Sequence, residues 1–195
     1  ILPREDLVRM PYESAVKESA PRVSIQLDPA PSTETLRLLW NQFEADPLRP
    51  MLLADTSTFL SAHHFLAAVG NSILPFVINV YGEPAGVFWL SRIAMVPPKM
   101  TMVSAFLAVY VLPAFRSKNI VNQSLSALLD IASGYGMEHL WAEVRIDNIP
   151  PQHALSKGGF TYVATLPSWE RYAGVWHDIA LYHMDMMKRR ETFQG

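Results

Sequence analysis

The feature that most constrains this chain is a run of almost entirely apolar side chains over residues 102–112, which ends at Pro113. An uninterrupted apolar run suits a central strand that is covered on both faces of a sheet. Pro113 has no amide hydrogen to donate and ends the strand. From Asn122 onward, apolar residues recur at helical spacing until residues 133–136, where glycines provide a stop. A buried strand therefore leads through a short loop into a helix.

That loop, residues 113–121, is suited to bind an anion. Backbone N–H groups in the first turn of a helix have no intrahelical acceptor, and they lie at the positive end of the helix dipole. A strand that leads directly into a helix lets these groups converge on one point. The anion that we expect there is the pyrophosphate of an acyl-coenzyme A.

A second strand and a second turn follow the helix. Residues 139–146 alternate between two kinds of side chain, as in a strand with unlike faces: Leu140, Ala142, Val144 and Ile146 against Trp141, Glu143 and Arg145. Asn148 comes directly after this strand, where it either binds a ligand amide or completes an ordinary turn. Residues 154–160 then read Ala-Leu-Ser-Lys-Gly-Gly-Phe.

In this order the motifs resemble those of the GNAT superfamily of N-acetyltransferases, especially the branch that acetylates ribosomal proteins and other protein N-termini. The family has Arg/Gln-x-x-Gly-x-Gly/Ala after its fourth strand, and Asn plus a short helix ending in Gly-Phe after its fifth. Here residues 116–121 read Arg-Ser-Lys-Asn-Ile-Val. Asn119 stands at a usual glycine, Val121 at a usual glycine or alanine, and Leu155 at a frequent general-acid tyrosine.

These departures bear on cofactor binding more than on the fold. After glycine, asparagine most readily adopts left-handed backbone conformations, so Asn119 can keep the shape of the loop. Val121 is less favourable, because its branched side chain brings bulk to a place where glycine allows close backbone approach. The branch that acetylates protein N-termini often has an apolar residue at the place of Leu155, and the chain resembles that branch in this respect.

The resemblance implies an α/β fold with a mixed, mostly antiparallel sheet that is flanked by helices. Two central parallel strands, residues 102–112 and 139–146, would splay apart. Acetyl-CoA is the implied co-substrate, with its pantetheine in the gap between these strands. The family's motif places the cofactor on Val109, Val111, Arg116, Ser117, Lys118, Asn119, Ile120, Val121 and Asn148.

The acceptor amine must be neutral to attack a thioester. An α-amino group has a reference pKa of about 7.7 to 8.0, whereas the pKa of lysine is about 10.4, so an N-terminal acceptor needs a weaker base. Glu143, on the strand face expected to line the cleft, is the predicted base, acting directly or through water. The alternative interpretation is that Glu143 is a surface carboxylate paired with Arg145 or Lys157.

The other elements are predicted from hydrophobic spacing and turn residues. Helices are expected from Ser32 to about Glu44 and from residues 55–58 to before Gly70. The expected strands are residues 76–81 and 87–93, joined by a turn at 82–86, and residues 160–166 and 175–184, with 169–174 between them.

Composition excludes several other classes of protein. A formal net charge of −2 and a pI near 6.3 lack the basic character of nucleic-acid-binding proteins. The absence of cysteine excludes a thiolate nucleophile, so acyl transfer must be direct or pass through another nucleophile, and direct attack in a ternary complex is expected. The six histidines form no i, i+4 pair or His-Glu motif, so no metal site is expected. With no bilayer-length apolar run and no secretory signal pattern, we expect a soluble, cytoplasmic protein that binds no membrane.

Prolines at positions 3, 11, 21, 29 and 31 predict a Pro-rich N-terminal arm over residues 1–31, ahead of an acyltransferase domain over residues 32–195. The arm either packs across the domain or reaches a second copy or a larger assembly. The predicted function is transfer of acetyl from acetyl-CoA to a primary amine of a protein N-terminus or a small molecule. The alternative is a GNAT-fold module that has lost catalysis and binds partners in an assembly.

Overall fold

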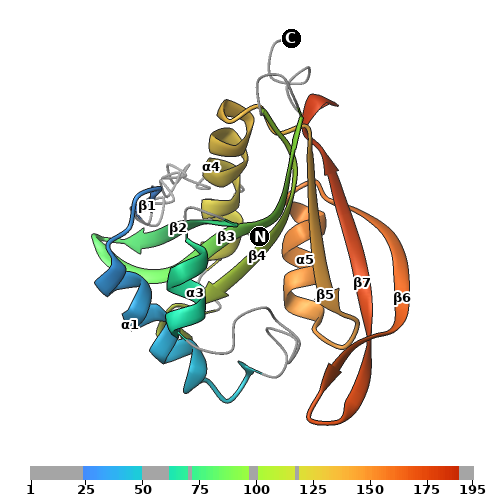
Figure 1. Ribbon diagram of the computed structural model, residues 1–195, viewed down its shortest axis with the longest axis horizontal. Helices are drawn as coiled ribbons and strands as arrows, with labels where there is room; N and C mark the ends of the chain where they lie inside the picture. The colour runs from blue at the N-terminus through green and yellow to red at the C-terminus, as the bar shows by residue number, and fades with distance from the viewer. Residues whose placement is uncertain (1–23, 50–61, 70–71, 97–100, 117–118, 189–195) are drawn as a thin grey trace, which may run out of the picture.

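A computed structural model shows a single twisted sheet with helices on both faces (Figure 1). It describes residues 24–49, 62–69, 72–96, 101–116 and 119–188. The strands are β1 (Ile25–Asp28), β2 (Ile73–Val80), β3 (Glu83–Val96), β4 (Thr101–Val111), β5 (His139–Arg145), β6 (Thr161–Tyr172) and β7 (Val175–Asp185). The helices are α1 (Thr33–Glu44), α3 (Ala62–Ala68), α4 (Ile120–Gly134) and α5 (Ile149–Lys157), with a 3₁₀ turn at Pro113–Phe115.

The sheet has the order β1-β2-β3-β4-β5-β7-β6, and β4 and β5 form its parallel pair. These two strands are joined only where Ser104, Ala105 and Phe106 lie opposite residues 139–141. Beyond Phe106, β4 stays paired with β3, and β5 stays paired with β7. Figure 1 shows the two strands moving apart toward their carboxyl ends. The predicted mixed sheet with a splayed parallel pair is confirmed.

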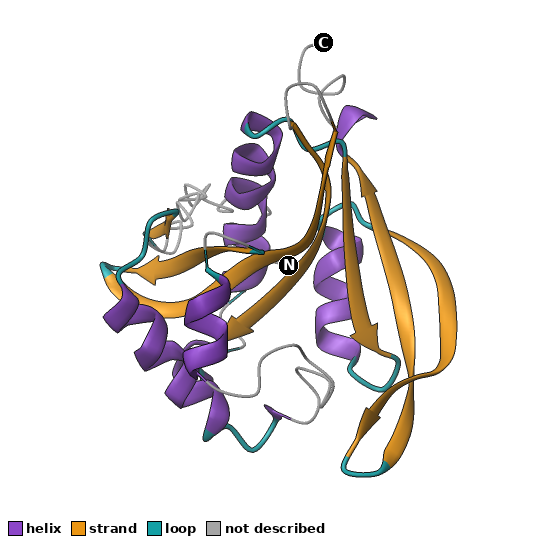
Figure 2. Cartoon of the chain, in the orientation of Figure 1, coloured by secondary structure: helices purple, strands orange, loops and turns teal. Residues whose placement is uncertain are grey.

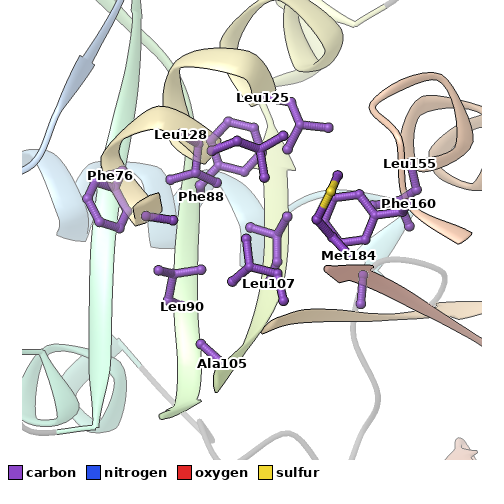
Figure 3. Close-up of a cluster of buried hydrophobic side chains, with 14 of the residues drawn as sticks. Phe76, Phe88, Leu90, Ala105, Leu107, Leu125, Leu128, Leu155, Phe160 and Met184 are labelled. Carbon is purple, nitrogen blue, oxygen red and sulfur yellow. The ribbon is translucent and has the colours of Figure 1, made fainter. Parts of the chain in front are cut away.

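Each face of the sheet carries its own hydrophobic core, because successive side chains of a strand point to opposite faces. On β4, Leu107 packs in the larger core with α4 and α5, whereas Tyr110 packs in the smaller core with α1 and α3. Figure 2 shows the helices on the two sides of the sheet. Figure 3 shows the larger core, where Leu125 and Leu128 of α4 meet Phe88 of β3. Each fully buried Leu or Phe contributes about 1.5 to 3 kcal/mol.

Two turn predictions were wrong, and both observed turns are tighter. Tyr81 and Gly82 have φ of 53° and 86°, so the chain reverses over two residues, and β3 already begins at Glu83. Likewise Ala173 and Gly174 have φ of 47° and 84°, so β6 runs through the segment 169–172 that was expected to connect the strands. Paired left-handed residues suit two-residue hairpins, since their twist matches that of the flanking strands.

In the N-terminal part of the chain, the first predicted helix is confirmed, and a strand that was not predicted precedes it. Ser32 caps α1, its side chain accepting a hydrogen bond from the backbone N–H of Thr35 at 3.1 Å. The predicted start of the second helix, residues 55–58, lies outside the described residues, which include its later part as α3. Strand β1 lies within the range predicted as an arm and pairs with β2, while residues 1–23 are outside the described part. No helix of the described chain is long and apolar enough to span a bilayer.

Candidate functional site

The junction between β4 and α4 has the backbone shape expected from the sequence. Asn119 has φ 57° and ψ 20°, which is the left-handed conformation predicted for it. Its side chain does not cap α4; instead its Oδ1 accepts a hydrogen bond from Asn122 Nδ2 at 2.6 Å. The first helical bond is donated by the N–H of Gln123 to the carbonyl of Asn119. The N–H groups of Ile120 and Val121 therefore have no intrahelical acceptor and are directed along the helix axis toward the loop.

The side chains of the first helical residues belong to the core. Ile120 is only 2% exposed, and Val121 is partly buried against the same larger core. The bulk of Val121 is therefore accommodated by packing, while its backbone stays at the helix N-terminus. Two other residues of the predicted loop, Ser117 and Lys118, lie outside the described residues.

Arg116, which opens the family motif, is held by an internal carboxylate. Its Nη1 donates to Asp46 Oδ1 at 3.3 Å, its Nη2 forms an ion pair with Asp46 Oδ2, and its Nε donates to the carbonyl of Val111 at 3.1 Å. The Asp46 side chain is fully buried and that of Arg116 is 26% exposed. Sequence analysis missed Asp46, because nothing in its local pattern distinguishes it from a helix-ending Asp-Pro.

Two further donors complete the environment of Asp46. The backbone N–H of Leu48 donates to it at 2.9 Å and the hydroxyl of Tyr110 at 3.1 Å. Burial by itself raises the pKa of Asp46, but the hydrogen bonds and charge of Arg116 outweigh it, so the pKa lies below its usual value. Burial and the negative charge of Asp46 together raise the pKa of Tyr110 well above the usual phenol range. At neutral pH Asp46 is therefore charged and Tyr110 is protonated.

The splay between β4 and β5 leaves one edge of β4 without a strand partner. Val109 and Val111 lie opposite Phe88 and Gly86 of β3, while β5 pairs with β4 no further than Phe106. The free edge offers main-chain groups to an extended ligand, as an additional strand would use them. Asn148 follows β5 with φ −92° and ψ 80°, and its side chain makes no capping hydrogen bond to α5. The carboxyl ends of two parallel strands thus bring Val111, Asn148 and the N-terminus of α4 to one edge of the sheet.

Glu143, the predicted base, pairs with a residue other than those considered from the sequence. Arg92 binds it through two hydrogen bonds, of 3.1 Å to Oε1 and 2.6 Å to Oε2. The Arg92 guanidinium carbon lies 3.4 Å from the centre of the Phe106 ring, so the side chain crosses β4 on its way to β5. Arg145 pairs instead with Asp147. The Arg92–Glu143 pair thus bridges β3 and β5 next to the last paired residues of β4 and β5.

A second carboxylate on this face, Glu170, was missed by the sequence analysis. Glu170 of β6 lies opposite His177 of β7, and Glu143 of β5 lies opposite Leu181. Because His177 and Leu181 are four residues apart on one strand, both carboxylates lie on the same face. Burial raises the pKa of Glu170, and the charge of Glu143 raises it further, against a smaller opposite effect of nearby arginines. No local signal indicated this position, because a register shift between Leu166 and Glu170 interrupts the regular alternation of β6.

The second sequence motif has structural roles in the described chain. Leu155 has no proton to donate, and its side chain, which is 8% exposed, packs in the larger core. Gly159 has φ 94°, which favours glycine, and a side-chain carbon on Gly158 would lie 2.4 Å from Leu125 Cδ2. Asp178 accepts a hydrogen bond from the backbone N–H of Ser168 at 2.8 Å, which is a structural role. Among the described residues, no three His, Asp or Glu side chains gather as metal ligands.

Comparison with known proteins agrees with this arrangement of strand, loop and helix. The acetyltransferase (GNAT) family is matched over residues 33–160, which is more than half of the chain. The chain therefore belongs to the GNAT acetyltransferase family. No curated protein sequence matches the chain.

Solved structures of acetyltransferases share the fold at low sequence identity. The spermidine N-acetyltransferase of Vibrio cholerae, solved with CoA and spermine, has a TM-score of 0.70 at 16% identity, covering 84% of this chain and 96% of its own. Mycobacterium smegmatis RimJ, in complex with CoA-disulfide, has a TM-score of 0.68 at 18% identity, covering 84% and 83%. A Salmonella typhimurium acetyltransferase that modifies the N-terminal serine of ribosomal protein L7/L12 has a TM-score of 0.65 at 18% identity, covering 83% and 95%.

Proposed function

We propose that this protein is an N-acetyltransferase that transfers an acetyl group from acetyl-CoA directly to a primary amine. The observation that carries the proposal is the left-handed Asn119 at the head of α4, next to a splayed β4–β5 pair. Asparagine keeps the loop shape that glycine gives in the family motif, and membership of the family supports the same chemistry. The N-acetyltransferase neighbours solved with CoA or a CoA disulfide support acetyl-CoA as the donor.

The cofactor would be held mainly by the protein backbone. The N–H groups of Ile120 and Val121 would bind the pyrophosphate, together with Ser117, Lys118 and Asn119 of the sequence motif. The pantetheine would pair with the free edge of β4 near Val109 and Val111, and Asn148 lies at the same edge of the sheet. A backbone amide near Val109 would stabilise the negative charge that develops on the thioester oxygen.

Transfer requires the acceptor nitrogen to attack the thioester carbon. A carbon–nitrogen bond forms, the carbon–sulfur bond breaks, and the CoA thiolate leaves and is protonated, while the amine proton passes to a base. Glu143 remains the proposed base, although both of its oxygens accept hydrogen bonds from Arg92. Glu170 is the second candidate, because its raised pKa makes it a better proton acceptor near neutral pH.

The acceptor is proposed to be a protein N-terminus or a small amine. Both classes occur among the structural neighbours, in the ribosomal-protein acetyltransferase and in the spermidine acetyltransferase. Because Leu155 is buried and no tyrosine hydroxyl stands in its place, a module that binds CoA or a partner without catalysis is the second candidate function. A cytoplasmic location and an assembly role for the N-terminal arm remain part of the proposal.

The test is acetyl transfer from acetyl-CoA to a panel of N-terminal peptides and polyamines, read by mass spectrometry, after calorimetry has shown whether acetyl-CoA binds. Binding with acetylation of one acceptor class supports the enzyme, whereas binding without transfer to any acceptor supports the non-catalytic module. Glu143→Gln and Glu170→Gln are then compared through the pH dependence of kcat/KM. The variant of the true base loses the acid limb of the profile together with most of kcat.

A further inference from the structure

We propose that Asp46 is a positioning residue for the cofactor loop, and that Arg116 acts on the cofactor through this carboxylate rather than by binding phosphate itself. The inference rests on the proposed function, since it concerns how the same loop binds acetyl-CoA. It assigns a role to Asp46, which lies outside the sequence motif of residues 116–121.

Three of the five N–H donors of Arg116 are already used. Nε is bonded to the carbonyl of Val111, while Nη1 and Nη2 are bonded to the two carboxylate oxygens of Asp46. This two-pronged arrangement fixes both the direction and the distance of a guanidinium group. Arg116 is therefore tied at once to the end of β4 and to Asp46, three positions before Asn119.

Asp46 is itself immobilised. The N–H of Leu48 and the hydroxyl of Tyr110 hold its carboxylate, and the Tyr110 ring packs edge-on against Phe43 of α1 at 5.1 Å. Both aromatic rings are buried in the smaller core. Arg116 is thus held against α1 and the core on the face of the sheet opposite α4.

The buried carboxylate of Asp46 neutralises Arg116, so the pair offers a phosphate little net attraction. If the guanidinium turned away from Asp46 to pair with pyrophosphate instead, three hydrogen bonds would break and Asp46 would be left charged and buried without its main partner, which is strongly unfavourable. Pyrophosphate binding then depends on backbone N–H groups whose direction the pair maintains.

The two roles of Arg116 predict opposite effects of Asp46→Asn. If the pair positions the loop, this substitution weakens acetyl-CoA binding by roughly fivefold or more, in the range of ordinary coupling between sites. The KM for acetyl-CoA rises, while kcat at saturating cofactor and the KM for the amine stay unchanged. If Arg116 is a direct phosphate ligand, the same substitution frees its charge and tightens binding, which overturns the proposal.

Calorimetric titration of the full chain with acetyl-CoA is the first measurement, with Glu44→Gln as the matched control. This exposed carboxylate at the end of α1 loses the same charge without touching Arg116. The expected result is weaker binding for Asp46→Asn and unchanged binding for Glu44→Gln. Equal affinities of wild type and Asp46→Asn would also refute the positioning role. Failure of the wild type to bind acetyl-CoA refutes the proposed function instead.

Two additional variants keep the inference testable if Asp46→Asn does not fold. Tyr110→Phe keeps the ring and removes one donor to Asp46, and it is expected to weaken binding in the same direction by a smaller factor. The double variant Asp46→Asn/Arg116→Gln replaces the ion pair by two neutral amides, and it is expected to bind more tightly than Arg116→Gln alone. Weaker binding by the double variant than by Arg116→Gln alone would show that Asp46 acts independently of Arg116, and would overturn the proposal.

Discussion

The hydroxyl of Tyr110 offers a clean measurement of the buried Asp46 site, because its removal creates almost no cavity. Tyr110 is 1% exposed, and its hydroxyl donates to Asp46 Oδ2 at 3.1 Å. A hydrogen bond to a charged group contributes about 1.5 to 3 kcal/mol to stability. Tyr110→Phe is therefore expected to lower the free energy of unfolding by that amount, which corresponds to a decrease in Tm of roughly 3 to 12 °C for a chain of this size.

Urea denaturation at pH 7 measures this loss as a lower midpoint with an unchanged m-value. Tyr81→Phe is the matched control, since Tyr81 is 65% exposed and its substitution should leave the midpoint unchanged. A loss below about 0.5 kcal/mol for Tyr110→Phe would be no larger than that expected for a hydrogen bond between two neutral groups, and would refute the assignment of a charged acceptor.

The same variant predicts a pH dependence. The folded pKa of Asp46 is lowered, so its ionised form contributes stability that is present above the unfolded pKa of about 3.9 and is lost as pH falls through the lower folded value. Tyr110→Phe removes part of what favours the ionised form. The difference in stability between wild type and variant should therefore be largest near neutrality and become smaller below about pH 4. An equal difference at pH 7 and pH 3.5 would contradict this explanation.

Two other regions of the chain give independent predictions. Gly159→Ala forces an alanine to φ 94° and should cost more than about 1 kcal/mol in thermal unfolding, whereas the control Gly134→Ala meets no atom within 4 Å and should be neutral or stabilising. Burial and the charge of His139 lower the pKa of His183, whose Nε2 lies 3.1 Å from His139 Nδ1. Stability should thus decrease as pH falls below about 6.5, and Tm should drop less in His183→Gln than in wild type between pH 7.5 and 5.5; equal drops would exclude His183 as the cause.

Most of the fold follows from patterns that are local in the sequence. The alternation in β5 and the helical spacing in α4 depend only on near neighbours, and both elements lie close to their predicted bounds. The two hairpin turns did not follow, because Tyr81 and Ala173 adopt positive φ although neither residue type favours it. The pairing of the flanking strands stabilises those conformations, and this pairing cannot be deduced from the residue types in the turns.

The candidate site also has parts that could be predicted from the sequence and parts that could not. The order of strand, loop and helix and the left-handed conformation of Asn119 could be predicted, because the loop joins consecutive elements. The pairs Arg116–Asp46 and Arg92–Glu143 could not, since their members are 70 and 51 positions apart in the chain. The sequence predicted a loop around Glu170. In the structure this residue lies in β6, close to the end of the strand, and its environment is therefore different. Such contacts depend on how the sheet is assembled.

The left-handed Asn119 has a consequence for how relatives of this protein can be found. The property that matters at this position is a backbone conformation, and asparagine supplies it with a side chain that glycine lacks. A search that requires glycine there discards chains of this type, although their main chain has the same course. Distant members are better sought by requiring residues that tolerate positive φ, glycine, asparagine or aspartate, between a buried strand and an apolar first helical turn.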